Sequence, residues 1–152
     1  MKIKGPWDAE RIARFLDDSR IPARIGVLTS SGTPLVLSLW YLPRGGAIWC
    51  ACNRRARVVE LLKRDPRCGF EIASDQPPYR GVRGQGRAQL DPPGGAEVLS
   101  ALLARYRISG RSQLAGILLE QAASGNEVAI RIDPDWMTSW DFSSRMHDAF
   151  EA

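Results

Sequence analysis

Short apolar segments separated by turn-forming residues dominate the pattern of this chain. Such segments, when glycine, proline or aspartate bounds them, predict β-strands. Six are expected, at residues 24–29, 35–42, 47–52, 68–73, 79–90 and 127–132. The first three predict two successive hairpins.

Two regions carry residues that interrupt regular strand pairing. Gly81, Gly84 and Gly86 predict bends or bulges within the fifth strand. The Asp-Pro-Asp sequence at 133–135 is expected to end the sixth strand, and residues 136–142 are expected to form a short extended tail.

Apolar residues at helical spacing predict four helices, at about residues 8–19, 55–64, 96–106 and 113–123. Asp8 can cap the first of them. Six strands with turn-rich connections and a few helices predict a small closed or half-closed barrel with helical covers. The fold class is therefore mainly β (α+β), in a single domain that spans residues 1–152.

The composition indicates in which cell compartment the protein works and which kinds of partner it has. The hydrophobic fraction of 44% and the charged fraction of 25% are typical of a soluble globular domain. No run approaches the ~20 apolar residues that span a membrane, and residues 1–7 lack the apolar stretch of a signal peptide. We therefore expect a cytoplasmic protein without a membrane partner. Nucleic acid is not expected either, because the aromatic residues lie in apolar runs rather than among basic residues.

Few residues are available for metal binding or nucleophilic catalysis. Cys50, Cys52 and Cys68 do not have zinc-like spacing, and His147 is the only histidine, so no metal site is expected. There is no nucleophile elbow and no Walker loop. Residues 81–86 are glycine-rich but lack the order of a dinucleotide fingerprint. If the protein is an enzyme, a cofactor is expected to supply the chemistry, and the catalytic residues stay unassigned.

Arginines gather where the third strand meets the second helix. Arg54, Arg55 and Arg57 lie between the apolar segment 47–52 and the helix that Pro66 ends. A helix start offers free N–H groups, and guanidinium groups fit phosphate oxygens, so the junction suits a phosphate or another anion. A solvated basic surface is the alternative, and the net charge of +4 is compatible with both.

Taken in order over about residues 8–142, the motifs resemble those of the FMN-binding split-barrel superfamily, the pyridoxamine-phosphate oxidase-like proteins. The segments that carry the resemblance are 25–29, 32–34, 35–41, 48–52, the basic helix start, 62–67, 78–90 and 133–142. The resemblance implies a six-stranded antiparallel split β-barrel of Greek-key type, with flanking helices. It also implies a homodimer with flavin sites at the subunit interface.

The resemblance further implies the residues that hold the flavin. Backbone of the second and third strands would line the ring, at Leu37, Ser38, Leu39, Trp40, Ala51 and Cys52. Arg57 takes the first position of the family's basic phosphate-binding pair, whereas Val58 stands where a lysine is usual. Arg54 or Arg55 could supply the missing charge. Tyr79 or Arg80 corresponds to the polar residue before the glycine strand, and Trp140 lies in the tail that returns to the site.

The resemblance implies an FMN-dependent oxidoreductase that acts on a small molecule. The deazaflavin coenzyme is the first alternative, for which Arg80, Arg83 and Arg87 could bind the acidic tail. A non-catalytic cofactor- or haem-binding barrel is the second. The terminal segment that binds substrate phosphate in pyridoxamine-phosphate oxidases is not recognisable, so that reaction is not predicted.

Overall fold

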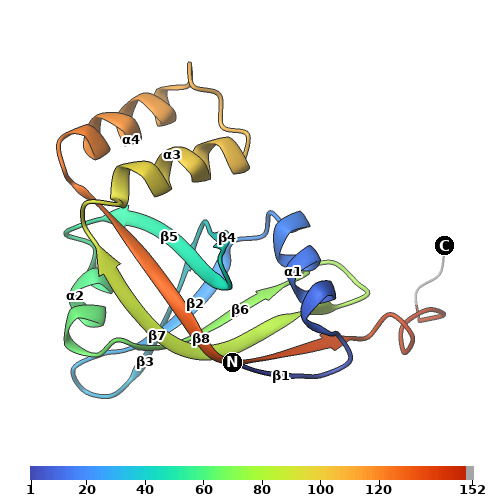
Figure 1. Ribbon diagram of the computed structural model, residues 1–152. Coiled ribbons are helices and arrows are strands. Elements are labelled where there is room, and N and C mark those ends of the chain that lie inside the picture. The colour runs from blue at the N-terminus through green and yellow to red at the C-terminus, as the bar shows by residue number, and fades with distance from the viewer. Residues whose placement is uncertain (150–152) are drawn as a thin grey trace.

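The structure is a computed structural model that describes residues 1–149. Eight strands and four helices follow one another along this part of the chain (Figure 1). The strands are β1 (Lys2–Lys4), β2 (Ala23–Leu28), β3 (Pro34–Leu39), β4 (Leu42–Arg44), β5 (Ala47–Asn53), β6 (Arg67–Ala73), β7 (Arg80–Asp91) and β8 (Glu127–Asp141). The helices are α1 (Ala9–Asp18), α2 (Arg57–Arg64), α3 (Gly95–Arg105) and α4 (Gln113–Ala123).

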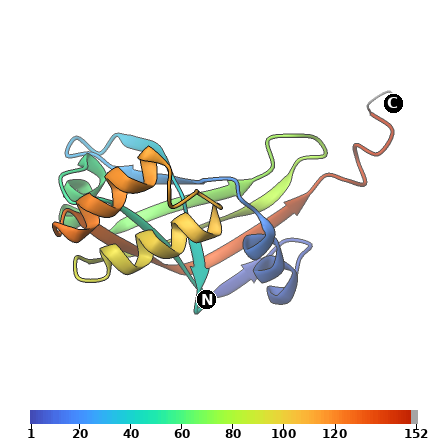
Figure 2. The ribbon, with the colours of Figure 1, turned by 90° about the horizontal axis from the view of Figure 1, so that it is seen from above.

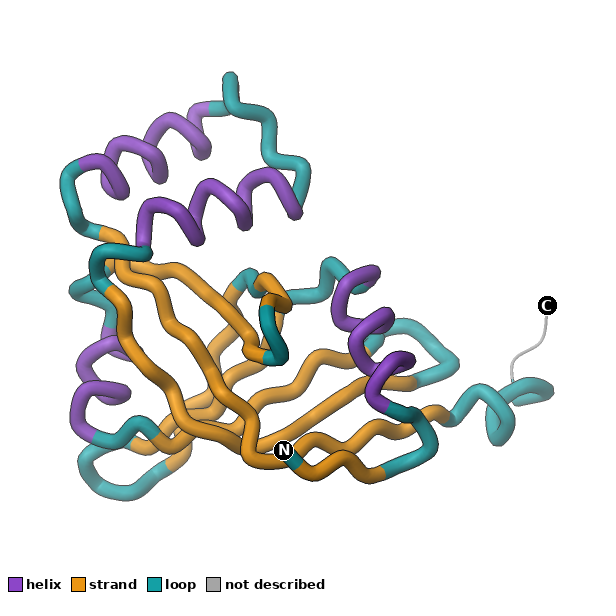
Figure 3. Tube along the Cα trace, viewed as in Figure 1, coloured by secondary structure: helices purple, strands orange, loops and turns teal. Residues whose placement is uncertain are grey.

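All eight strands belong to one strongly bent sheet, with the order β3-β2-β6-β7-β8-β5-β4 and with β1 paired to β8. The long strands β7 and β8 pair along the whole length of β7 and run from one end of the sheet to the other, as Figure 3 shows. In this hydrogen-bonded order β3 and β4 are the two end strands, so the barrel is split between them.

The barrel core follows from the alternation of apolar and polar residues along the strands. On β7, Val82 and Ala88 point inward, while Arg83, Gln85 and Arg87 are exposed on the outer face. Ile25, Ile48, Ile130 and Ile132 are almost completely buried in the same core. Each such side chain contributes about 1.5–3 kcal/mol by its removal from water, so the core holds the sheet in its bent form.

The strand count differs from the expected six. The segment 35–42 divides into β3 and the short β4, and β4 rather than β3 forms a hairpin with β5. Gly45 and Gly46, with φ of 59° and 77°, make its two-residue turn, which needs positive φ at both positions. The prediction that the whole segment 35–42 pairs with the strand at 47–52 is therefore wrong, because only β4 pairs with β5 there. The sequence did not predict β1.

The last strand is also longer than expected. Asp133 and Pro134 do not end it, because β8 continues to Asp141 along the whole of β7. The pairing shifts its register at Gln85 and Gly86, opposite Pro134 and Trp136. A bulge at this point tolerates a proline, which has no N–H to donate to the ladder. The irregularity lies beside Gly86, where one was expected, but the extra residue is Asp135 of β8 rather than a residue of β7.

The helices cover different parts of the sheet. Figure 2 shows α3 and α4 side by side on one end of the molecule and α1 on another. Val98 and Leu102 of α3 pack on Ala129 of β8, and α4 packs mainly on α3. No described helix is both long enough and apolar enough for a membrane crossing.

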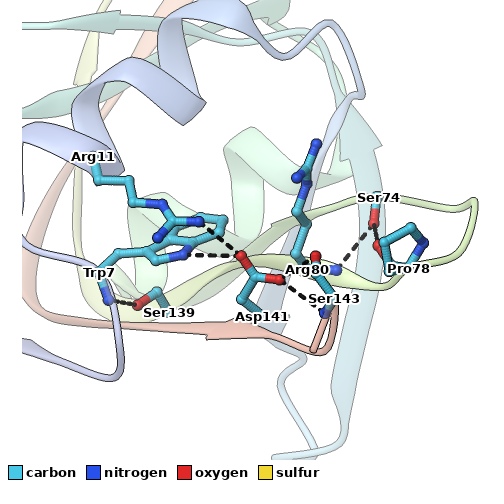
Figure 4. A network of polar contacts seen from close by, with 8 residues as sticks. All are labelled: Trp7, Arg11, Ser74, Pro78, Arg80, Ser139, Asp141 and Ser143. Carbon is cyan, nitrogen blue, oxygen red and sulfur yellow. Dashed lines mark hydrogen bonds and ion pairs between the residues drawn. The ribbon is translucent and has the colours of Figure 1, made fainter. Parts of the chain in front are cut away.

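A polar network fixes the N-terminal segment to the end of β8 (Figure 4). The expected cap of α1 is present, because Asp8 accepts a hydrogen bond of 2.8 Å from the Arg11 N–H. The Asp141 carboxylate accepts from Trp7 Nε1 at 3.2 Å and from Arg11 at 2.9 Å. Burial opposes the ionisation of Asp141, but Ser143, Trp7 and Arg11 together hold its pKa below the ordinary value. The network therefore contains an ionised carboxylate at neutral pH.

Candidate functional site

A cavity of about 380 Å³ lies where the split of the barrel meets the α3–α4 pair. This volume is within the range of about 300–1,000 Å³ that is usual for small-molecule sites. The end of β3, the end of β5, both helices and the start of β8 contribute to its wall. The lining residues are Pro22, Ser38, Leu39, Trp40, Ala51, Cys52, Asn53, Leu99, Leu102, Leu118, Gln121 and Glu127. We call this cavity the split pocket.

The split pocket brings together most of the residues for which ring contacts were expected. Ser38, Leu39 and Trp40 come from β3 and the segment after it, and Ala51 and Cys52 come from β5. Because β3 and β5 are not hydrogen-bonded partners, the cavity can open between them. Leu37 is not among the lining residues, and its side chain packs against the barrel core.

Trp40 forms a fixed wall of this region. Its ring stacks on Tyr106 with a centroid distance of 5.0 Å and an interplanar angle of 16°. Tyr106 is itself held, because its hydroxyl oxygen accepts a hydrogen bond of 3.3 Å from the Tyr41 N–H. One face of the Trp40 indole is therefore occupied by the protein, which leaves its edge and its other face for a ligand.

The arginine junction directly follows the pocket-lining Asn53. Arg54, Arg55 and Arg57 are exposed, and none of them makes an ion pair within residues 1–149. The turn is held by backbone contacts: the Arg54 N–H donates to the Asn126 carbonyl at 2.7 Å. Ala56 occupies the cap position of α2 and offers no side-chain hydrogen bond. The Val59 N–H already donates to the Ala56 carbonyl at 3.0 Å, so the N–H groups of Arg57 and Val58 and the nearby guanidinium groups are the ones available to an anion.

The other expected site residues lie at the opposite end of the sheet. Tyr79 and Arg80 are exposed at the start of β7, where Arg80 pairs with Asp141. Trp140 lies beside them, and the Arg83 guanidinium is 5.1 Å from the centre of a Trp140 ring. The β7–β8 pairing runs from Arg80 and Asp141 to Asp91 and Ala129, a path of roughly 40 Å along the bent strand. None of Tyr79, Arg80 and Trp140 lines the split pocket of its own chain. Their part in a flavin site stays a prediction.

One residue of the pocket was not foreseen. Glu127 as a whole residue is 4% exposed and lines the pocket, and its carboxylate has no hydrogen-bond or ion-pair partner within the described chain, although its oxygens keep some exposure. Burial raises the pKa of this carboxyl. The sequence marks Glu127 only as the start of a strand, since nothing local shows that α3 and α4 will cover it.

Cys50 and Cys68 are small buried residues, as expected, whereas Cys52 is half-buried in the wall of the split pocket. Burial raises the pKa of the Cys52 thiol to about 12, and it also raises the pKa of Cys50. These thiols stay protonated at neutral pH and are poor nucleophiles. Within residues 1–149 no three histidine, cysteine or acidic side chains gather as a metal site would need.

Comparisons with known proteins match this chain to solved structures but to no family model and no curated sequence. The crystal structure of conserved hypothetical protein Rv2991 from Mycobacterium tuberculosis has a TM-score of 0.79 and 22% identity, over 97% of this chain and 92% of that one. An F420 reductase has a TM-score of 0.66 and 19% identity, over 87% and 97%.

A protein from Listeria innocua that carries the name of a pyridoxamine 5′-phosphate oxidase has a TM-score of 0.65 and 15% identity. The match covers 86% of this chain and 95% of that one. At these identities the likeness establishes the fold. The chain therefore shares the fold of these structures, which is the split-barrel fold that the resemblance implied.

Proposed function

We propose that the protein is an FMN-binding oxidoreductase that acts on a small molecule. One observation carries the proposal: the ring contacts that the resemblance implies lie in a single pocket, beside arginines that make no ion pair within residues 1–149. These contacts are Ser38, Leu39, Trp40, Ala51 and Cys52. A planar ring needs apolar walls with a few polar groups, and a phosphate needs a positive site near them. The two parts are adjacent through Asn53 and Arg54.

The chain would hold FMN in two ways. Arg57, with Arg54 or Arg55 and the N–H groups at the start of α2, would bind the phosphate. The walls of the split pocket would orient the ring and exclude water, with Leu99 and Leu102 as apolar cover. A bound flavin supplies hydride-transfer chemistry, which this chain's own side chains do not offer.

A homodimer is part of the proposal. Tyr79, Arg80 and Trp140 lie too far from their own split pocket, so only a second copy could bring them to it. The outer face of the sheet is suited to such a contact: Val36 is 66% exposed there, and Gly26 and Gly69 leave a groove.

We expect light scattering at micromolar concentration to give about twice the chain mass of 16.8 kDa. This mass should be independent of added FMN, because the sheet face is present without the ligand. A monomer under these conditions would remove the partner's residues from the site, and the pocket would then have to act alone.

Titration of the purified protein with FMN and with the deazaflavin coenzyme tests the choice of cofactor. Since FMN carries a single phosphate, we expect it to bind more tightly, and its affinity should fall only weakly with salt. The absorption spectrum of the purified protein provides an independent readout of any flavin retained. Absence of FMN binding at both low and high salt would refute the proposal.

The deazaflavin coenzyme is the second candidate, because Arg80, Arg83 and Arg87 are exposed along one strand. These residues could bind an acidic tail, and a structural neighbour carries the name F420 reductase. Tighter binding of this coenzyme, with a steep loss of affinity as salt rises, would favour it over FMN. Haem is less suited to the site, because no histidine lines the split pocket and His147 is exposed.

A further inference from the structure

The Glu127 carboxylate is the polar group in the split pocket whose position needs an explanation. A buried carboxylate normally accepts hydrogen bonds or pairs with a cation, because its removal from water is otherwise costly. Glu127 as a whole residue is 4% exposed, and its carboxylate has neither kind of partner among residues 1–149. Its oxygens are not sealed off, because Arg105 Nε is the fully buried polar side-chain atom that lacks a partner in this part of the chain. The little area that Glu127 exposes therefore faces the split pocket that it lines. Glu127 is also held firmly, since its backbone pairs with Asn53 of β5.

The surroundings of Glu127 are close to neutral. Cys52 is the titratable group beside it, and that thiol has a pKa of about 12. The other polar side chains that line the pocket are Ser38, Asn53 and Gln121, which carry no charge. Arg54 after β5 and Glu120 on α4 are exposed to solvent. With no cation to stabilise the charged form, burial favours the protonated acid.

We propose that Glu127 is a positioning and specificity residue that donates a hydrogen bond to an acceptor atom of the ring ligand in the split pocket. A carbonyl oxygen or an unprotonated ring nitrogen of a planar heterocycle is the matching chemistry. This inference rests on the proposed function, because the flavin ring is the occupant assigned to the pocket. It adds a side-chain contact to a site otherwise attributed to strand backbone and arginines.

The first test uses the ligand-free protein. A carboxyl with a raised pKa stabilises the fold fully below its unfolded pKa, and this stability is lost as pH rises through the folded pKa. Glu127→Gln cannot ionise, so its melting temperature should exceed that of the wild type increasingly as pH rises above 4.5, the ordinary value. Glu120→Gln, which changes an exposed carboxyl on α4, is the matched control and should show no such trend.

The second test measures the affinity for riboflavin, which has the ring but no phosphate and so isolates the pocket from the arginine junction. The wild-type affinity should fall as pH rises through the pKa of Glu127, which burial raises above its ordinary value, because the acid then loses the proton that it donates. Glu127→Gln keeps a donor and should bind with little dependence on pH. Glu127→Met lacks a donor and should bind about three- to tenfold more weakly than Glu127→Gln.

The outcomes separate the inference from the proposed function. Riboflavin affinity that depends equally on pH in the wild type and in Glu127→Gln would overturn the role of Glu127 and leave flavin binding intact. Equal affinities of Glu127→Gln and Glu127→Met, with both variants folded, would do the same. Absence of riboflavin and FMN binding by the wild type at every pH would refute the proposed function and this inference together.

Discussion

Arg57→Ala is expected to weaken FMN binding about ten- to a hundredfold. The variant removes a charge-assisted contact with the phosphate, which is worth roughly 1.5–3 kcal/mol. The side chain is exposed at the first residue of α2 and makes no ion pair within the described chain, so the fold should be unaffected. Quenching of flavin fluorescence in the wild type and the variant measures the two dissociation constants.

Riboflavin provides the internal control for this prediction. Because riboflavin has no phosphate, Arg57→Ala should bind it as tightly as the wild type does. Arg111→Ala removes an exposed charge on the α3–α4 connection and controls for net charge. Equal FMN affinity in Arg57→Ala and the wild type would place the phosphate elsewhere, and an equal loss for both ligands would indicate a damaged pocket.

Gly95→Ala is expected to destabilise the protein and to distort the split pocket. A Cβ atom at Gly95 would lie 2.3 Å from the Glu127 carbonyl oxygen, and neither backbone can yield without a shift of α3. Such overpacking costs about 1–3 kcal/mol, or a melting temperature lower by on the order of 5 °C. Since α3 supplies Leu99 and Leu102 to the pocket, FMN affinity should fall as well.

Gly116→Ala is the matched control, because it makes the same change in α4 where nothing lies within 4 Å of the new Cβ. In this helix interior alanine should stabilise the protein by about 0.5–1 kcal/mol. Thermal unfolding of the two variants should therefore move in opposite directions. A melting temperature that rises in Gly95→Ala would show that α3 is not pressed against the start of β8.

Much of the fold could be predicted because its signals are local. Residues 113–123 form α4 with the bounds expected from periodicity, and Asp8 caps α1. The errors lie where the existence or length of a strand depends on the strand that it pairs with. Three residues such as Lys2–Lys4 form a strand only because β8 is beside them. Likewise, Pro134 stays within β8 because a bulge in the β7–β8 pairing accommodates it.

The same distinction explains the site. Ser38 and Ala51 could be found because strand motifs place them, and the structure puts both in one pocket. Glu127 could not be found from the sequence. Its burial depends on how α3 and α4 pack over the start of β8, and no local pattern of the sequence shows that packing. Nor could the sequence show that Tyr79 and Trp140 lie a full strand length away, since that separation follows from the unbroken course of β8.

The split that opens the pocket also leaves β3 and β4 as free edges of the sheet, and free edges invite unwanted pairing between molecules. The chain limits this hazard at both. β4 has three residues, and its central Pro43 has no N–H to offer a neighbouring strand. β3 begins with Pro34, which has no N–H either, and its other end lines the split pocket. The two edge strands at the split therefore contain prolines that limit pairing with a strand of another molecule.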